Sequence, residues 1–271
     1  MDDIDTLREE IKRLRKSLSD LTPSLDVLLK RRGFKIYKKE PSDDLLLPAP
    51  NFVDSFYEMM KKYSFRLFLR DVIKRQKFFL VDDVTRYASS EVTGAYISYL
   101  TEIGLVEKES NGFRLNLQPI KSFGETLEWF VAETFKREFE TESVWGIRFK
   151  RPRVGGDYDL ISKVDGSILY MEVKSSPPKQ IYQNEISAFL DRVFDLLPQI
   201  GIFFVDTELR MKDKIVLMFE EELKKRYAEP PRVSRIEKEL FQIWDNVFII
   251  NAKDSITANI EKVLIRYFRG K

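Results

Sequence analysis

The chain has 271 residues, of which 43% are hydrophobic and 33% are charged, and its formal net charge is +2. This composition is typical of a globular protein, and the length is enough for two ordinary domains or for one domain with extensions. The near-neutral charge gives no argument for nucleic-acid binding by the chain as a whole. The chain has no Cys and no His, which excludes disulfides, thiolate zinc sites, His-ligated zinc enzymes, Cys nucleophiles and Ser-His-Asp catalysis. Any catalysis must use carboxylates, Lys, Tyr, Ser, Thr or a metal held by oxygen ligands.

No apolar run approaches the roughly 18 residues that can span a membrane, and the N-terminus is acidic rather than signal-like. We therefore expect a cytoplasmic, nucleoid-associated protein with no membrane partner. The absence of Cys together with abundant Lys and Glu is typical of proteins from hot environments.

The first 50 residues predict a coiled-coil helix followed by a basic arm. Over residues 3–21, apolar residues recur at alternating spacings of three and four, which gives about two and a half heptads of a seam: Ile4, Leu7, Ile11, Leu14, Leu18 and Leu21. So short a seam is marginal alone, so it either self-associates, which favours a homodimer, or packs on its own chain. Several prolines then indicate an arm, which carries a tight basic cluster: Lys30, Arg31, Arg32, Lys35, Lys38 and Lys39.

Residues 51–118 predict a helical domain that ends in a two-stranded hairpin. The expected helices cover 52–63, 64–76, 81–88 and 91–103, and the expected strands 105–109 and 113–117 flank an Asn-Gly turn at 111–112. This order, with the stretch SSEVTGAYISYLTEIGLVEKESNGFRL, resembles a winged helix-turn-helix domain. The resemblance implies that helix 91–103 is a recognition helix, which offers Thr93, Tyr96 and Glu91 to a groove. That helix has no Arg or Lys, so protein contacts or dimerisation stay open as its use beside DNA binding.

Residues 119–271 predict an α/β domain. The expected helices cover 122–139, 186–197, 212–227, 233–241 and 255–268. The expected strands cover 144–149, the two arms of a hairpin centred on 165–166, 201–205 and 247–251. Helices alternating with apolar strands around a hairpin give a mixed sheet flanked by helices.

The central hairpin carries the chemically most informative residues. Asp165-Gly166 between two apolar alternating runs predicts a two-residue turn. Counting outward from this turn, Asp159 lies opposite Glu172, and Asp157 lies opposite Lys174. Directly opposed carboxylates repel by roughly 0.2–1 kcal/mol at an exposed site. A divalent cation between them would remove this repulsion, so the hairpin predicts a metal site.

Asp159 and Glu172 would supply the hard oxygen ligands that Mg²⁺ prefers, with Mn²⁺ as a substitute. Lys174 lies two residues after Glu172 and so projects from the same face. Its ammonium would orient or help to deprotonate an attacking water, or stabilise charge on a phosphate. The alternative is structural: Asp157 and Lys174 would form an ordinary cross-strand ion pair.

The segments GGDYDLI and YMEVKSS, with the upstream helix GETLEWFVAETF, resemble the PD-(D/E)XK nuclease superfamily over residues 119–271. The upstream helix is similar to that of Mrr-like and archaeal Holliday-junction-resolvase-like members. The resemblance implies a restriction-endonuclease-like fold, a metal ligand in the Val173 backbone carbonyl, and Glu128 as an extra catalytic carboxylate. Glu125, three residues earlier on nearly the same face, competes with Glu128. The resemblance also implies a polar residue near the site at Gln183.

The sequence thus predicts a metal-dependent DNA endonuclease acting in repair, recombination or restriction. Four cations just before the hairpin would attract the DNA backbone: Arg148, Lys150, Arg151 and Arg153. Two alternatives stay open, a non-catalytic DNA-binding or regulatory protein on a nuclease scaffold and a nuclease subunit that works with a helicase. Duplex, branched and single-stranded DNA, and RNA, all stay open as substrates. Tyr158, Trp129 and Trp145 are expected to pack in the core.

Overall fold

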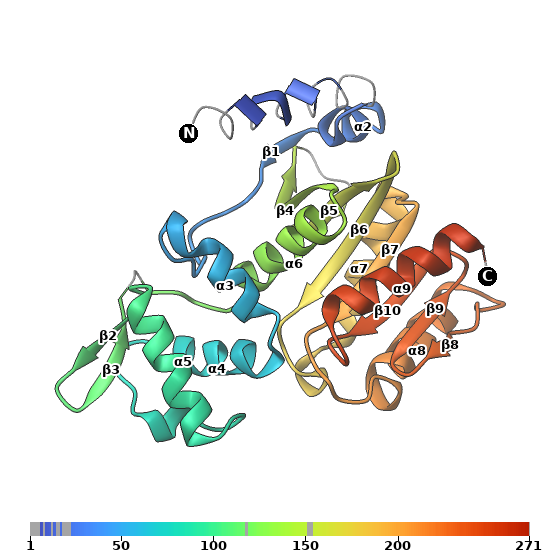
Figure 1. The fold of residues 1–271 in the computed structure, drawn as a ribbon. Coiled ribbons are helices and arrows are strands. Elements are labelled where there is room, and N and C mark those ends of the chain that lie inside the picture. Colours follow the sequence, from blue (N-terminus) through green and yellow to red (C-terminus); the bar gives the residue numbers. More distant parts are fainter. Residues whose placement is uncertain are drawn as a thin grey trace.

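The computed structural model describes residues 6–7, 9–11, 13–14, 17, 23–116, 119–150 and 154–270. Its centre is an eight-stranded mixed sheet in the order β1-β4-β5-β6-β7-β10-β9-β8 (Figure 1). Strands β4 to β6 pair antiparallel, β6, β7 and β10 pair parallel, and β10, β9 and β8 pair antiparallel. The strands are β1 (Ile36–Lys38), β4 (Glu142–Phe149), β5 (Tyr158–Val164), β6 (Ser167–Lys174), β7 (Ile200–Val205), β8 (Ser234–Glu237), β9 (Leu240–Ile243) and β10 (Val247–Asn251). The expected mixed α/β architecture is confirmed at this level.

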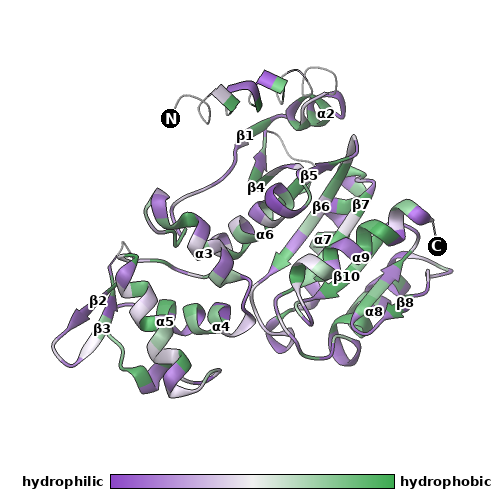
Figure 2. Cartoon of the chain, in the orientation of Figure 1, coloured by the Kyte–Doolittle hydropathy of each residue, from purple (hydrophilic) through white to green (hydrophobic). Residues whose placement is uncertain are grey.

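Helices cover both faces of the sheet. Helices α6 (Gly124–Glu138) and α9 (Ile256–Arg269) pack on one face, and α7 (Gln183–Leu196) and α8 (Leu217–Arg226) pack on the other. Strands β7 and β10 are apolar almost throughout (Figure 2), as expected of parallel strands that are buried on both faces. Among the described residues, no helix is long and apolar enough to cross a membrane.

A smaller helical unit lies against α6 and the ends of β6 and β7 (Figure 1). It comprises the 3₁₀ turn Pro50–Phe52, α3 (Val53–Met60), α4 (Tyr63–Lys74), the 3₁₀ turn Val81–Val84, α5 (Ser90–Glu102) and the hairpin of β2 (Val106–Glu109) and β3 (Gly112–Leu115). Ser89 caps α5 by accepting a hydrogen bond from the Val92 amide. The element order matches the expected helices and two-stranded wing, although residues 81–88 form only a 3₁₀ turn.

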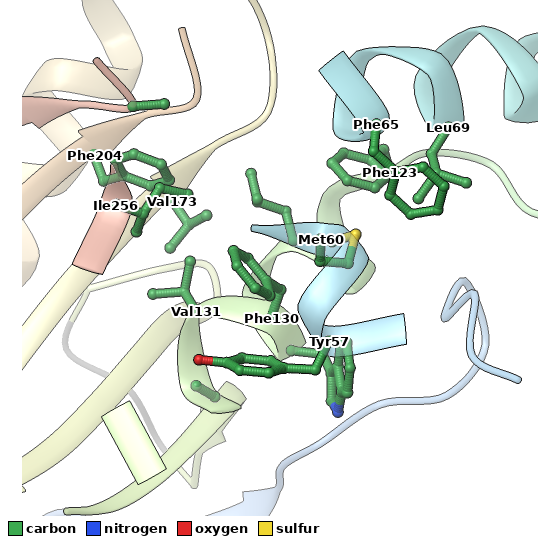
Figure 3. Close-up of a cluster of buried hydrophobic side chains, with 14 of the residues drawn as sticks. Tyr57, Met60, Phe65, Leu69, Phe123, Phe130, Val131, Val173, Phe204 and Ile256 are labelled. Atoms are coloured by element: carbon green, nitrogen blue, oxygen red, sulfur yellow. The ribbon is translucent and has the colours of Figure 1, made fainter. Parts of the chain in front are cut away.

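The helical unit and the sheet share one hydrophobic core. Tyr57 of α3 packs on Phe130 of α6 with their ring centroids 5.4 Å apart. The same cluster continues through Val131 to Val173 of β6 and Phe204 of β7 (Figure 3). The two parts are therefore joined by packing and not only by a linker.

The segment expected to be a free arm is partly built into the sheet. Strand β1 pairs with β4, and α2 (Leu25–Arg31) buries Leu25 and Leu29 in the core on the α7 side. Arg32 of the basic cluster donates to the Leu196 and Leu197 carbonyls at 3.2 and 2.8 Å. These bonds satisfy carbonyl groups at the C-terminal end of α7, which have no partner within the helix, so Arg32 stabilises the fold.

Two further expectations differ from the structure. Residues 233–241 form the β8–β9 hairpin instead of a helix, because pairing with buried β10 outweighs the helical spacing of Val233, Ile236 and Leu240. The wing turn falls one residue earlier than expected, since Glu109 pairs with Gly112 and leaves Ser110 and Asn111 as the turn.

Candidate functional site

The β5–β6 hairpin has the register that the sequence predicts. Val164 pairs with Ser167, and the ladder continues outward to Leu160 opposite Met171. One further step along the strands places Asp159 opposite Glu172. At this position the Asp159 side chain, and not its backbone, bonds to β6: Asp159 Oδ2 accepts a hydrogen bond from the Val173 amide at 2.7 Å. In a strand, the N–H and C=O groups of one residue point to the same edge, so the Val173 carbonyl also faces β5.

The side chains of β4 and β5 change from one face of the sheet to the other, at Gly146 in β4 and at Asp159 in β5. Residues two apart in a strand normally share a face, yet Tyr158 belongs to the core on the α7 side and Leu160 to the core on the α6 side. The neighbouring strand does the same on either side of Gly146, which has φ +55°. The Asp159 carboxylate is therefore at a kink between the two faces of the sheet.

The kink brings Glu128 of α6 close to the strands. A Cβ on Gly146 would lie 3.8 Å from Glu128 Oε2, and it would clash with Pro41 Cδ at 2.4 Å. A glycine is therefore required at this position both for its dihedral angle and for the close approach. Asp159 is a main electrostatic neighbour of Glu128. Glu128 and Asp159, which come from different elements, therefore both lie next to Gly146.

Glu172 lies beside them but is fully engaged. Its side chain is buried, with 2% of its surface exposed. Oε1 accepts from Lys174 Nζ at 2.7 Å and from Arg192 Nη1 at 3.1 Å. Oε2 accepts from Arg192 Nη1 at 2.8 Å and from the Tyr170 hydroxyl. These contacts come from three donor groups and engage both oxygens of Glu172.

Lys174 stays charged in this setting. Burial alone would lower the pKa of Lys174, but Glu172 and Asp159 outweigh burial and raise it. The ammonium also lies 3.4 Å from Glu185 of α7. This favours donation of hydrogen bonds to a phosphate over the alternative of deprotonating a water, because a general base must first be neutral.

The other two carboxylates hold their protons more tightly than usual. Burial, followed by repulsion from Glu172, raises the pKa of Asp159 to about 7. Burial and repulsion from Asp159 and Glu125 raise the pKa of Glu128 well above its ordinary value. Such shifts mark a place where negative charge lacks compensation.

The oxygen atoms of this site fit a hard divalent cation in part. Among the described residues, no hydrogen bond or ion pair engages the Glu128 carboxylate, and Asp159 uses only Oδ2. These oxygens and the Val173 carbonyl are suitable donors for Mg²⁺. Glu172 fits only if it releases a present partner. Within the described ranges, no three acidic side chains are grouped closely enough to form a ready cation site.

Several predicted site residues lie elsewhere or have other partners. Arg148 forms a bidentate ion pair with Asp157 at 2.7 Å, so Asp157 does not pair with Lys174. The Gln183 amide donates to Met218 O and Glu222 Oε2 and ties α7 to α8. Lys150 is exposed, and Arg151 and Arg153 lie outside the described residues.

The expected recognition residues of α5 point inward, which corrects that prediction. Thr93 is fully buried, and Tyr96 is 6% exposed with its hydroxyl 2.9 Å from Ser64 Oγ. Only the Glu91 side of α5 reaches solvent. Glu125, the competitor of Glu128, is committed to the backbone because it accepts the Asp44 amide at 2.9 Å. The expected core positions of Trp129, Trp145 and Tyr158 are confirmed. 

Sequence reasoning missed two residues that contact Glu172, namely Tyr170 and Arg192, and a third, Glu185, that pairs with Lys174. Tyr170 lies two positions earlier on the same strand, so strand periodicity alone could have placed it on this face. Glu185 and Arg192 are seven residues apart, about two turns, on one face of α7, a spacing that is common among charged residues of amphipathic helices. Their position beneath β6 follows only from tertiary packing.

No protein-family model matches the chain, and no curated protein matches its sequence. Among solved structures, the chain is similar to Can2 from Sulfobacillus thermosulfidooxidans in complex with cyclic tetra-adenylate, at 12% identity and a TM-score of 0.52. The alignment covers 90% of this chain and 60% of the Can2 chain. A second similar structure is protein VC1899 from Vibrio cholerae, at 11% identity and a TM-score of 0.47, with 71% and 54% of the two chains covered.

The fold thus defines a mixed α/β protein with an attached helical unit. The likeness to Can2 extends over both parts of the chain, since it covers nine tenths of it. At this identity the likeness concerns the fold alone. The chain spans less than two thirds of the Can2 chain, so the activity of a longer protein does not transfer to it.

Proposed function

We propose that the protein is a metal-dependent nuclease that hydrolyses phosphodiester bonds, with DNA as its substrate and Mg²⁺ as its cofactor. The observation that carries the proposal is the approach of Glu128 to Gly146, the residue of β4 beside Asp159, with Lys174 among the charges that act on both carboxylates. The negative charge of Asp159 and Glu128 would attract a metal ion, and the positive charge of Lys174 would attract a phosphate, so the site could bind both together.

Each residue has a separate task in this proposal. Asp159, Glu128 and the Val173 carbonyl would hold the ion, which when bound lowers the pKa of its water and stabilises charge on the phosphate. Lys174 would donate a hydrogen bond to a non-bridging phosphate oxygen. Arg192 and Tyr170 keep Glu172 in place through hydrogen bonds to its oxygens and act as positioning residues.

The contact between Lys174 and Glu172 would couple the binding of substrate to the binding of the cation. A phosphate near Lys174 would compete with Glu172 Oε1 for the ammonium, because both are anionic acceptors. With the ammonium turned to the phosphate, Oε1 would keep only its 3.1 Å contact with Arg192 Nη1 and would have room for a cation. This exchange would bring Glu172 into the ligand set only when substrate is present.

The test is cleavage of labelled DNA with Mg²⁺, Mn²⁺ or EDTA by the wild type and by Asp159→Asn and Lys174→Met variants. We expect each variant to lose roughly 10²–10⁴-fold in rate, as removal of such groups does in other enzymes. Asp157→Asn is the matched control, since this carboxylate is two residues away and pairs with Arg148. Metal-dependent cleavage that persists in Asp159→Asn would remove this site from the reaction.

One observation favours a second candidate, a nucleic-acid-binding protein on a nuclease scaffold. Glu172 is already neutralised by Lys174 and Arg192, as a site without a cation requires. Isothermal titration with Mn²⁺ separates the candidates. A nuclease binds the ion and loses this binding in Asp159→Asn, whereas a scaffold protein shows no heat of binding in either form.

A further inference from the structure

A large cleft lies between the helical unit and the carboxyl ends of β6 and β7. Its volume is about 810 Å³, within the range of roughly 300–1,000 Å³ usual for ligand sites. One wall comes from α4 and the loop before α5, and the other from residues 175–180 and 206–209. We call this space the interdomain cleft.

The interdomain cleft carries an excess of positive charge. Its lining includes five cations, Arg70, Lys74, Arg86, Lys121 and Lys179, against three acids, Asp71, Asp206 and Glu208. Asp206 is already paired with two guanidinium groups, those of Arg66 and Arg70. Asp71 lies 3.7 Å from Lys74. Lys121 lies 3.8 Å from Asp44, so the positive charge left for an anionic ligand is that of Arg86 and Lys179, with Glu208 opposing it.

Two cations on opposite walls have no acidic partner among the described residues. Arg86 comes from the helical unit and stacks its guanidinium over the Tyr87 ring, with 5.3 Å to the centroid. Lys179 belongs to the 3₁₀ turn Pro178–Gln180 of the α/β part. Both side chains are exposed. An anion bound between them would contact both parts of the chain.

The lining also offers an aromatic surface. Tyr87 is 43% exposed, although large aromatic rings normally bury most of their area. Aromatic rings beside Arg and Lys form the combination that binds single-stranded nucleic acid, because bases stack on the rings while the cations follow the phosphates. A duplex is too wide to enter a cavity of this volume.

The interdomain cleft adjoins the end of β6, the strand that carries Glu172 and Lys174. Ser175 and Ser176 in its lining follow Lys174 directly, and the Asp206 amide donates to the Lys174 carbonyl at 2.8 Å. In Figure 1, β6 runs toward α4 and so ends at this junction. Phe123 of the lining lies just before α6, which carries Glu128. The interdomain cleft is therefore lined by residues that directly precede α6 and directly follow β6, the two elements that carry Glu128 and Lys174.

We propose that the interdomain cleft binds single-stranded nucleic acid and guides it to the site at Asp159 and Glu128. Arg86 and Lys179 contact successive phosphates, and Tyr87 stacks on a base. This inference rests on the proposed nuclease function for its second half. The binding itself requires no cation and no catalysis.

The experiment measures fluorescence anisotropy of labelled single-stranded DNA, single-stranded RNA and a DNA duplex, all in EDTA. The wild type is compared with an Arg86→Ala/Lys179→Ala variant and with Tyr87→Ala. A Lys224→Ala/Lys225→Ala variant is the matched control, because it removes two exposed cations from α8 on the other face of the sheet. Thermal melting of each variant confirms that it is folded.

We expect single strands to bind more tightly than the duplex. The double variant and Tyr87→Ala should each weaken single-strand binding about tenfold or more, with no change in the control. The salt slope of binding should also fall by roughly 1–2 in the double variant, because about two phosphate contacts are lost. Tighter duplex binding by the wild type, or unchanged single-strand binding by the double variant, would overturn the proposal. Single-strand binding in EDTA together with no cleavage in the separate assay with Mg²⁺ or Mn²⁺ would instead count against the nuclease function and leave the cleft assignment intact.

Discussion

At the scale of single residues, Gly156 is required for the arrangement around Glu172. It has φ +94°, and a Cβ there would lie 2.4 Å from Arg192 Nη2. We expect Gly156→Ala to destabilise the protein by about 1–3 kcal/mol, because the alanine is strained and displaces a buried guanidinium. Urea unfolding measures this change. Gly155→Ala is the control, since a Cβ there has no neighbour within 4 Å. Equal stability of the two variants would contradict the prediction.

Asp159 makes stability depend on pH in a defined direction. Its pKa is about 7 in the folded state, against 3.8 as the ordinary value. Because the folded pKa is raised, the stabilisation from its protonation is fully present below about pH 4 and is lost as the pH rises through 7. Asp159→Asn carries no charge at any pH. Between about pH 5 and pH 8, the free energy of unfolding of the wild type should therefore fall relative to that of Asp159→Asn by on the order of 2 kcal/mol.

Urea unfolding at the two pH values, in EDTA, measures this difference. Asp157→Asn is the reference variant, because it removes an exposed carboxylate two residues away. A stability difference between Asp159→Asn and the wild type that is the same at both pH values would refute the assigned pKa.

At the scale of elements, the β5–β6 turn depends on two left-handed residues. Asp165 has φ +48° and Gly166 has φ +77°, as a type I′ turn requires. Gly166→Ala should cost about 1–2 kcal/mol, because Ala is strained at positive φ. Gly94→Ala in α5 should instead stabilise by about 0.5–1 kcal/mol through helix propensity. Neither site has a neighbour within 4 Å of an added Cβ, so only the dihedral differs. Denaturation curves with the same sign for both variants would contradict the argument.

The elements also explain which features the sequence could predict. The Asp165-Gly166 turn sets the register locally, so the pairing from Val164–Ser167 to Leu160–Met171 could be predicted by counting, and Asp159 and Glu172 are the next residues along the two strands. The β8–β9 hairpin could not be found in this way, because its strands are stabilised by pairing with β10 and not by their own spacing. Thr93 and Tyr96 point inward because α5 packs on α4, through the Tyr96 and Phe65 rings 5.1 Å apart.

The candidate site shows the same division. Asp159, Glu172 and Lys174 belong to one hairpin, so local pattern was enough to bring them together. Arg192 comes from a helix that packs beneath β6, and no local pattern in α7 marks it as a partner of Glu172. Its engagement of Glu172 is a tertiary effect, and it changes the expected role of that residue from an open metal ligand to an anchored one.

At the scale of the whole molecule, a buried ion pair fastens the helical unit to the sheet. Arg66 and Arg70 of α4 both pair with Asp206 at the end of β7, which is fully buried. Asp206→Ala should cost about 3–5 kcal/mol, because it leaves two guanidinium groups buried without an anion. Asp157→Ala breaks an exposed pair and should cost less than about 1 kcal/mol. Calorimetry measures both, and a change of less than about 1 kcal/mol in Asp206→Ala would refute this role.

Exposed apolar residues near the N-terminus provide a surface through which two copies of the molecule could associate. Leu7, Ile11 and Leu14 are 59%, 49% and 57% exposed, while Ile4, Leu18 and Leu21 lie outside the described residues. Apolar side chains at heptad spacing are stabilised when a second helix covers them. We therefore expect the protein to dimerise through this seam and the variant Leu7→Ser/Leu14→Ser to be monomeric. Sedimentation velocity over a range of concentrations measures this.

Leu217→Ser is the control, because Leu217 is 49% exposed on α8 without a heptad pattern. A dimer that persists in the double variant would place the interface elsewhere, and a wild type that stays monomeric at high micromolar concentration would exclude self-association by the seam.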